Sequence, residues 1–293
     1  MSNAFAGSTV EAARRALTAR FKSGSIESAE LDARILVGEA LGLDLTGLIA
    51  AAHRPLTSDE SLRLENFANQ RLSGEPIARI VGYKEFWGLA LKLSPATLVP
   101  RPDTETVVEL SLEMLQAVPE QDRPLRIADL GTGSGAILLA LLSELPGAYG
   151  VGTDISVAAL RTARANAAAL ELADRAGFIA CDYAAALSGP FDLVTSNPPY
   201  VRSSDIAGLA VEVRDHDPFG ALDGGADGLD AYRKLIPQAA ALLAQQGALV
   251  VEAGHGQSDD VQRLMTAAGL TLERHAKADL AGVRRAVAGR KLP

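Results

Sequence analysis

The residues best suited to chemistry are Asn197, Pro198, Pro199 and Tyr200, which directly follow the apolar run 191–195. The apolar run predicts a short buried strand, and the prolines end it because neither can donate a backbone hydrogen bond to a sheet. Asn197 precedes a proline and is therefore held extended. The sequence predicts a rigid corner with a side-chain amide, backbone carbonyls and an aromatic ring, placed where open α/β sheets bind ligands.

A glycine-rich loop lies upstream, at 129–135, and predicts a cofactor site. Glycines permit a sharp turn and a close approach of the backbone to a ligand, and the helix that follows offers unbonded N–H groups. The spacing is Gly-x-Gly-x-Gly, whereas a dinucleotide-binding loop has Gly-x-Gly-x-x-Gly, so the case for a pyrophosphate is weaker. The loop residues expected to bind the cofactor are Gly131, Thr132, Gly133, Ser134 and Gly135.

Two further strand ends carry side chains that suit a nucleoside. Asp154 ends the second predicted strand, where a carboxylate can bind both hydroxyls of a ribose. Asp182 and Tyr183 end the third, where the acid can hydrogen-bond to an adenine and the ring can stack on it. The plainer alternatives are a capping role for Asp154 and a packing role for Tyr183. Their positions at successive strand ends favour ligand binding.

After residue 100, predicted strands and helices alternate, which is typical of a parallel, doubly wound α/β sheet. Strands are expected at 125–130, 149–154, 177–181, 191–195 and 248–252, with closing strands near 270–274 and 284–288. Helices are expected at 103–117, 136–145, 157–170, 232–243 and 259–268.

The chain before this region is predicted to be helical. Capping boxes at 8–11 and 57–60 begin two helices, and another helix runs from Ser28 to Leu41 before Gly42 ends it. We expect the apolar residues Leu31, Ile35 and Leu36 to form the buried face of that helix. From 77 to 93 the apolar period changes to two, which predicts a β-hairpin.

The composition indicates a soluble cytoplasmic protein. The 293 residues are 48% apolar, and the single cysteine, Cys181, indicates a reducing compartment. Neither a signal peptide nor the roughly 20-residue apolar run of a spanning helix is visible. A net charge of -8 argues against nucleic acid or a membrane as the main partner. The four histidines lack metal-ligand spacing, so no metal is expected. We also expect a monomer.

The loop 129–135, Asp154 and the Asn-Pro-Pro-Tyr corner at 197–200 resemble S-adenosylmethionine-dependent class I methyltransferases that act on a planar nitrogen. Two further segments, 98–105 and 221–233, resemble the N5-glutamine methyltransferases of peptide chain release factors, the HemK/PrmC family. The resemblance covers nearly the whole chain. The sequence departs from the family pattern at Tyr183, at Asp217-Pro218 and in a loose version of the motif at 252–257.

The resemblance implies a Rossmann-like class I methyltransferase sheet with an N-terminal helical bundle and a connecting β-hairpin. We expect a helical substrate-recognition domain at 1–75, a β-hairpin linker at 76–99 and the methyltransferase domain at 100–293. Gly131 to Gly135, Asp154, Tyr183 and Asn197 would bind S-adenosylmethionine. The corner 197–200 would bind the glutamine of a release factor's Gly-Gly-Gln loop.

The corner also suits the transfer itself. An amide nitrogen is a poor nucleophile, and it reacts only if its N–H groups and lone pair are oriented. The Asn197 side-chain oxygen and the Pro198 carbonyl can accept its two N–H groups, and Tyr200 can pack on the flat amide. We therefore expect Asn197, Pro198 and Tyr200 to be catalytic.

Three alternatives remain open. The same corner would serve an exocyclic amine of adenine or guanine in nucleic acid, although the acidic chain does not suggest a basic surface. A glutamine of a ribosomal protein is a second possible substrate. A cofactor-binding regulator without activity would need the glycine loop but not the corner.

Overall fold

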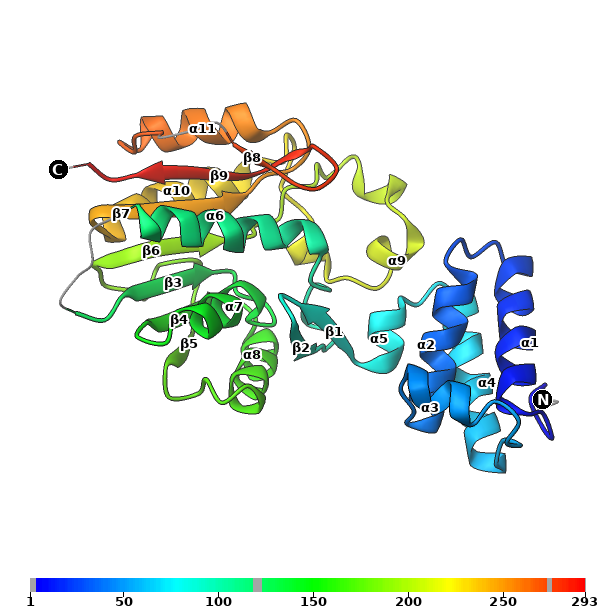
Figure 1. Cartoon of the computed structure of the whole chain (residues 1–293). Helices are drawn as coiled ribbons and strands as arrows, with labels where there is room; N and C mark the ends of the chain where they lie inside the picture. Colours follow the sequence, from blue (N-terminus) through cyan, green and yellow to red (C-terminus); the bar gives the residue numbers. More distant parts are fainter. Residues whose placement is uncertain (1–3, 118–122, 273–275, 293) are drawn as a thin grey trace. The chain divides into compact units, whose positions relative to one another are not determined.

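The chain forms two compact units, a bundle of helices and a β-sheet covered by helices (Figure 1). The structure is a computed structural model that describes residues 4–117, 123–272 and 276–292. Met1–Gly82 form the first unit, called here the helical unit, and Tyr83–Pro293 form the second, called here the sheet unit. Across the described residues, no helix has both the length and the apolar character that crossing a membrane requires.

The helical unit packs its helices around an apolar core. Its helices are α1 Val10–Ser23, α2 Ala29–Leu41, α3 Leu45–Ala50, α4 Ser58–Leu72 and α5 Ile77–Val81. The capping box at Thr57 and Glu60 is confirmed, and Gly42 ends α2 in the left-handed conformation. The box at 8–11 is wrong, because Thr9 caps α1 and accepts a hydrogen bond from the Ala12 N–H. The residue at the third helical position is then an alanine, which cannot complete a box.

The predicted buried face of α2 is partly wrong. Leu31 is exposed, and the buried side chains include Asp32, Ala33 and Leu36. Asp32 is buried because its Oδ2 accepts a hydrogen bond from Arg71 Nε on α4 at 2.7 Å. Asp32 thus occupies the buried position that the apolar pattern assigned to Leu31.

The predicted hairpin begins later than expected, because residues 77–81 form α5. Ile77, Ile80 and Val81 fit a helical spacing as well as an alternating one. The hairpin consists of β1 Tyr83–Phe86 and β2 Leu89–Lys92, paired antiparallel. Trp87 and Gly88 form its two-residue turn with φ of +53° and +71°, as a tight hairpin turn requires.

The sheet unit contains a seven-stranded sheet in the order β5-β4-β3-β6-β7-β9-β8. Its strands are β3 Arg126–Leu130, β4 Tyr149–Asp154, β5 Ala176–Ala180, β6 Phe191–Ser196, β7 Leu243–Glu252, β8 Lys277–Ala278 and β9 Arg284–Arg290. Strands β3 to β7 pair in parallel, and β9 pairs antiparallel with β7 and β8. The reversed last strand is therefore confirmed.

One predicted strand is wrong and one is too short. Within 270–272, only Thr271 pairs, in an isolated bridge to Arg290, and 273–274 lie outside the described residues. β7 begins at Leu243 rather than at 248, because Leu243 pairs with Phe191 of β6, before an irregularity that separates this pair from the regular pairing that starts at Ala248.

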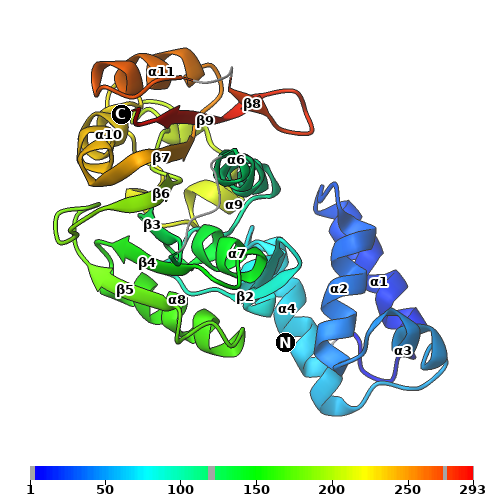
Figure 2. The same cartoon turned by 60° about the vertical axis from the view of Figure 1, so that its left-hand side comes forward.

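Helices cover both faces of the sheet (Figure 2). They are α6 Glu105–Gln116, α7 Ala136–Glu144, α8 Val157–Ala169, α10 Asp230–Leu242 and α11 Ser258–Ala267, whereas the short helix α9 Val211–Arg214 belongs to the segment that connects β6 with α10. Successive residues of a strand point to opposite faces of the sheet and so belong to two different cores. In β6, Leu193 packs in the core with α6, α7 and α8, whereas Val194 packs in the core with α10 and α11. The central strands β3 and β6 and the second half of β7 are buried on both faces, which explains why their sequences are mainly apolar.

The chain leaves β3 in one direction toward β4 and β5 and later returns to place β6 on the other side of β3. Such a switch point opens a crevice at the carboxyl ends of the strands. The glycine-rich loop follows β3 and Asn197 follows β6, so both predicted sites lie at this crevice.

The buried ion pair of the helical unit gives a prediction of stability. The Arg71 and Asp32 side chains are 7% and 5% exposed, so Arg71→Met leaves a buried carboxylate without its cation. We expect a loss of about 3–5 kcal/mol in the free energy of unfolding, measured by circular dichroism in urea. The control is Lys22→Met, which breaks the exposed pair to Glu30 and should leave the unfolding midpoint unchanged. Equal midpoints for both variants would contradict the prediction.

Candidate active site

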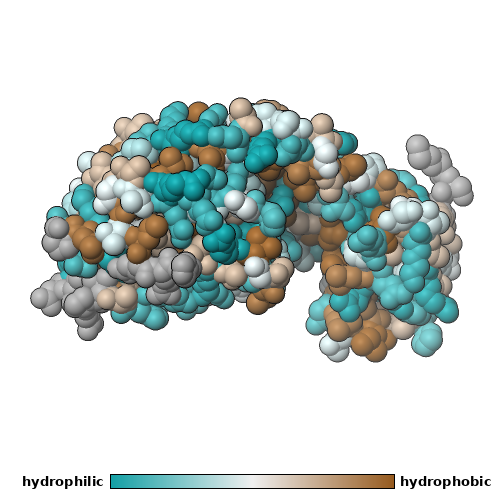
Figure 3. Space-filling view, turned by 90° about the horizontal axis from the view of Figure 1, so that it is seen from above, coloured by the Kyte–Doolittle hydropathy of each residue, from teal (hydrophilic) through white to brown (hydrophobic). Residues whose placement is uncertain are grey.

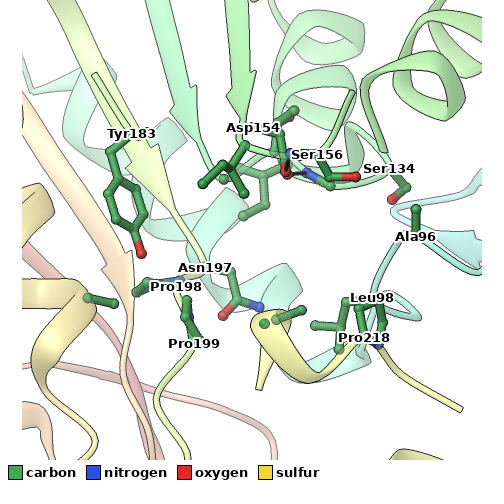
Figure 4. A pocket seen from close by; sticks show the side chains of 18 of the residues that line it. Ala96, Leu98, Ser134, Asp154, Ser156, Tyr183, Asn197, Pro198, Pro199 and Pro218 are labelled. Atoms are coloured by element: carbon green, nitrogen blue, oxygen red, sulfur yellow. Dashed lines mark hydrogen bonds between the residues drawn. The ribbon is translucent and has the colours of Figure 1, made fainter. Parts of the chain in front are cut away.

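A pocket of about 620 Å³ lies at the carboxyl ends of β3, β4 and β6 (Figure 4). Ten of the predicted site residues line it, and they are Gly131, Thr132, Gly133, Ser134, Asp154, Asp182, Tyr183, Asn197, Pro198 and Pro199. Gly135 and Tyr200 are not among the residues that line it. A volume of this size suits a nucleoside-sized ligand.

The glycine-rich loop presents backbone to the pocket. Gly131 and Gly133 have φ of +72° and +56°, which disfavours any side chain, and no atom lies within 4 Å of where a Cβ of Gly133 would stand. A ligand can therefore approach the backbone there. Gly135 differs, because its Cβ would lie 3.1 Å from Leu139 Cδ1. It allows α7 to begin and to pack, and it does not face the pocket.

Asp154 is fixed by backbone donors. Its two oxygens accept hydrogen bonds from the N–H groups of Gly133 at 2.9 Å and Ser156 at 2.8 Å. Each carboxylate oxygen has a further lone pair, so the side chain can still accept hydroxyl groups. Figure 4 shows Asp154 on the opposite side of the pocket from Asn197.

Asp182 and Tyr183 line the pocket beyond β5. Tyr183 has a φ of +49°, a conformation that is uncommon for a large side chain and is found at functional sites. Burial raises the pKa of Tyr183 to about 12, so its hydroxyl stays neutral. Asp182 forms an ion pair with Lys234 of α10, which the sequence did not predict. The pair is half exposed, and such pairs add little stability, so a ligand can replace it.

The corner after β6 presents two unused acceptors. Asn197 Nδ2 donates to Thr104 Oγ1 at 3.2 Å, whereas among the described residues nothing donates to Asn197 Oδ1. The Pro198 carbonyl likewise accepts no hydrogen bond from the described part of the chain. Both acceptors belong to residues that line the pocket.

Tyr200 points its hydroxyl away to a buried acid. The hydroxyl donates to Glu252 Oε1 at 3.1 Å, and burial together with the Glu252 charge raises the pKa of Tyr200. Gln257 supports the Tyr200 backbone, because its Nε2 donates to the carbonyls of Tyr200 and Gly228 at 3.1 and 3.3 Å. Residues of the segments 221–229 and 252–257 therefore hold Tyr200, the last residue of the corner, in place.

Sequence reasoning missed part of the apolar lining. Ala96, Leu98 and Pro100 line the pocket from the segment between the hairpin and α6, and Pro218 and Ala221 line it from the segment between β6 and α10. Figure 4 labels Ala96, Leu98 and Pro218. Leu98 and Pro100 belong to the segment 98–105 and Ala221 to the segment 221–233, so the resemblance to the family was the one signal that marked them.

Two charged residues near this segment do not reach the pocket. Glu105 Oε1 accepts a hydrogen bond from the Trp87 N–H at 2.8 Å, so it holds the hairpin. Arg101 is not among the lining residues either. Asp217 accepts from the Val99 N–H at 3.3 Å and so connects the two segments that carry the apolar lining.

The charge of the pocket suits a cation. Among the described residues that line it, Asp154, Asp182, Asp223 and Asp230 are acidic and Lys234 is basic. S-adenosylmethionine carries a sulfonium and an ammonium group, which such a field attracts, whereas the pyrophosphate of a dinucleotide would be repelled. The open glycine backbone and the position of the Asp154 carboxylate fit the same ligand.

A Rossmann-like sheet with a reversed last strand, a glycine loop after β3 and an acid after β4 defines a class I S-adenosylmethionine-dependent methyltransferase. Residues 12–82 match the family model of the PrmC N-terminal domain, and residues 108–213 match that of the methyltransferase small domain. The chain belongs to the release factor glutamine methyltransferase family.

Relatives of that name cover nearly the whole chain. The release factor glutamine methyltransferase of Bradyrhizobium diazoefficiens is 61% identical over 100% of this chain and 98% of its own length. The one from Rhodospirillum rubrum is 48% identical over 93% of this chain and 82% of its own.

Solved structures share the fold at low identity. The catalytic domain of hMettl16 in complex with a MAT2A 3'UTR hairpin has a TM-score of 0.55 at 16% identity, covering 80% of this chain and 84% of that one. A methyltransferase from Pyrococcus furiosus has a TM-score of 0.51 at 15% identity, covering 78% and 100%.

The packing around Tyr200 gives a second prediction. Gly228 has a φ of +78°, and a Cβ there would lie 2.4 Å from the Tyr200 carbonyl oxygen. Gly228→Ala should therefore lower the free energy of unfolding by about 1–3 kcal/mol, through strain and a clash with backbone. Thermal unfolding measures it. The matched control is Gly208→Ala, where no atom lies within 4 Å of the new Cβ, and a variant pair with the same melting temperature would refute the packing role.

Proposed function

We propose that this methyltransferase transfers the methyl group of S-adenosylmethionine to the side-chain amide nitrogen of the glutamine in the Gly-Gly-Gln motif of peptide chain release factors. The names of its relatives support the substrate. The observation that carries the proposal is the pair of free acceptors, Asn197 Oδ1 and the Pro198 carbonyl, on the wall of the cofactor pocket.

Two acceptors match the two N–H groups of a primary amide. When both N–H groups are held, the plane of the amide is fixed, and the nitrogen can react only through one of the two faces of that plane, toward which the methyl group would be presented. The acceptors also stabilise the positive charge that develops on the nitrogen as it bonds to carbon. Bound S-adenosylmethionine supplies the electrophilic methyl group on a sulfonium. Gly131, Gly133, Asp154 and Tyr183 would hold it.

No strong base is needed for this reaction. As the nitrogen–carbon bond forms and the sulfur–carbon bond breaks, the nitrogen carries one proton too many, and it loses this proton readily to water because the amide carbonyl withdraws electrons from it. The neutral acceptors at the corner agree with this requirement. A direct contact of the Tyr200 ring with the substrate stays a prediction, because its hydroxyl is bound to Glu252.

A side-by-side assay tests the function. We expect labelled S-adenosylmethionine to methylate release factor, with no transfer to ribosomal protein or nucleic acid under the same conditions. Asn197→Ala should lower kcat roughly 100-fold and change the cofactor Kd little, because the orientation of the amide is lost. Asn197→Asp keeps an acceptor and adds charge, and it separates acceptor loss from charge effects. Transfer to nucleic acid alone, or near-native turnover by Asn197→Ala, would refute the proposal.

The helical unit is proposed to select the protein substrate. Large apolar side chains are exposed on it, Leu31 on α2, Leu45 and Ile49 on α3 and Leu62 on α4, at 48–70% of their surface. Figure 3 shows hydrophobic residues, in brown, among the hydrophilic residues on the surface of this unit. Exposed apolar residues of this kind suit a protein partner. We also propose that the protein is a cytoplasmic monomer.

A short substrate checks this role. A Gly-Gly-Gln peptide lacks the remote contacts that position the reacting amide, so its kcat/KM should be far below that of intact release factor. Ile49→Ser should reduce kcat/KM for the intact factor and leave the peptide rate unchanged, and Tyr149→Ser, exposed at 53% on the sheet unit, is the control. If the two substrates were used equally well, the helical unit would have no part in recognition.

A further inference from the structure

We infer that Thr104 and Glu252 are positioning residues that determine which end of the Asn197 amide faces the pocket. The inference rests on the proposed function, in which Asn197 Oδ1 accepts an N–H of the reacting amide. Neither residue was singled out by the sequence as part of the chemistry, and each acts through Asn197.

The three side chains form a chain of hydrogen bonds across three segments of the sheet unit. Thr104 ends the short 3-10 helix Pro102–Thr104, Glu252 ends β7, and Asn197 follows β6. Thr104 Oγ1 donates to Glu252 Oε2, and Asn197 Nδ2 donates to Thr104 Oγ1 at 3.2 Å. Thr104 and Glu252 are 4% and 1% exposed, so water does not substitute for either bond.

The number of hydrogens sets the direction of this chain. A hydroxyl has one hydrogen, and a carboxylate can only accept. Once Thr104 gives its hydrogen to Glu252, its oxygen can only accept, and of the two ends of Asn197 only Nδ2 can donate to it. The Asn197 oxygen is then turned away from Thr104 and is left free.

A flipped amide would break this arrangement. Asn197 Oδ1 would meet the Thr104 oxygen with no hydrogen between them, or Thr104 would turn its hydrogen away from a buried carboxylate. An unpaired buried acceptor costs about 1–3 kcal/mol, and more when it is charged. The flipped Nδ2 would also direct its hydrogens at the N–H of the substrate.

The ionised form of Glu252 is the one its neighbours bind. Its other oxygen, Oε1, accepts the Tyr200 hydroxyl, so both oxygens receive a hydrogen. Burial raises the pKa of Glu252, and the Thr104 and Tyr200 hydrogen bonds, together with the positive charges of Arg285 and Arg101, oppose that rise. Glu252 is therefore the negatively charged acceptor at the end of the chain of hydrogen bonds, and it fixes the direction in which Thr104 and Asn197 donate.

Isosteric variants of the full-length protein test the inference. Thr104→Val removes the hydroxyl and keeps the shape, so kcat for release factor should fall roughly 10- to 100-fold while the cofactor Kd stays the same. Thr104→Ser keeps the hydroxyl and should restore most of kcat. Thr106→Val is the matched control: Thr106 is also buried on α6, and among the described residues its hydroxyl makes no hydrogen bond. It should behave as wild type.

A double variant separates positioning from mere stability. If Thr104 acts through Asn197, then Thr104→Val should cost nothing further once Asn197→Ala is present. Glu252→Gln, which can offer a donor to Thr104, should lower kcat as Thr104→Val does. It provides the same test if Thr104→Val does not fold by circular dichroism.

The outcomes are distinct. Wild-type turnover by both Thr104→Val and Glu252→Gln, or losses that multiply with Asn197→Ala, would overturn the inference and leave the proposed function intact. No methylation of release factor by the wild type and the Thr106→Val control would refute the proposed function itself.

Discussion

The buried carboxylate of Asp129 connects the glycine-rich loop 129–135 to the strand that ends at the Asn-Pro-Pro-Tyr corner, and the spacing of these two parts of the pocket depends on it. It is 1% exposed, and its two oxygens accept hydrogen bonds from Thr132 at 2.6 Å and Thr195 at 3.0 Å. Burial raises the pKa of Asp129 to about 6, and these two hydroxyls oppose the rise. Because Thr132 belongs to the glycine loop and Thr195 to β6, one side chain fixes the loop and the corner relative to each other.

The sequence predicted the parts of the site that are contiguous. The glycine loop, Asp154 and Asn197 each follow an apolar run directly, and the carboxyl ends of parallel strands meet at one edge of the sheet. The contacts between distant segments were not predictable in this way. Lys234 on Asp182, and Thr104 on Glu252, join residues 52 and 148 positions apart, and no local pattern marks such pairs.

Local ambiguity explains the errors in the fold. Residues 77–81 fit both a helical and an alternating spacing, and Pro76 and Gly82 at their ends favour a single helical turn or two. In α2 the buried Asp32 depends on Arg71 of another helix, so the apolar pattern alone placed Leu31 inward. The sequence also could not distinguish the roles of the glycines in the loop. Gly133 leaves open space for a ligand, whereas Gly135 makes room for the side chain of Leu139.

The placement of charge follows from the reaction. Methyl transfer moves positive charge from a sulfonium to a nitrogen, so acids suit the cofactor end of the pocket, where Asp154 and Asp182 lie. At the corner, a carboxylate in direct contact would bind cations as readily as an amide, and it would not distinguish the glutamine side chain from a lysine. The neutral Asn197 avoids this, but a free amide can flip. In the arrangement that we propose, Glu252 would prevent this flip through Thr104, because its charge would orient the amide without direct contact with the substrate.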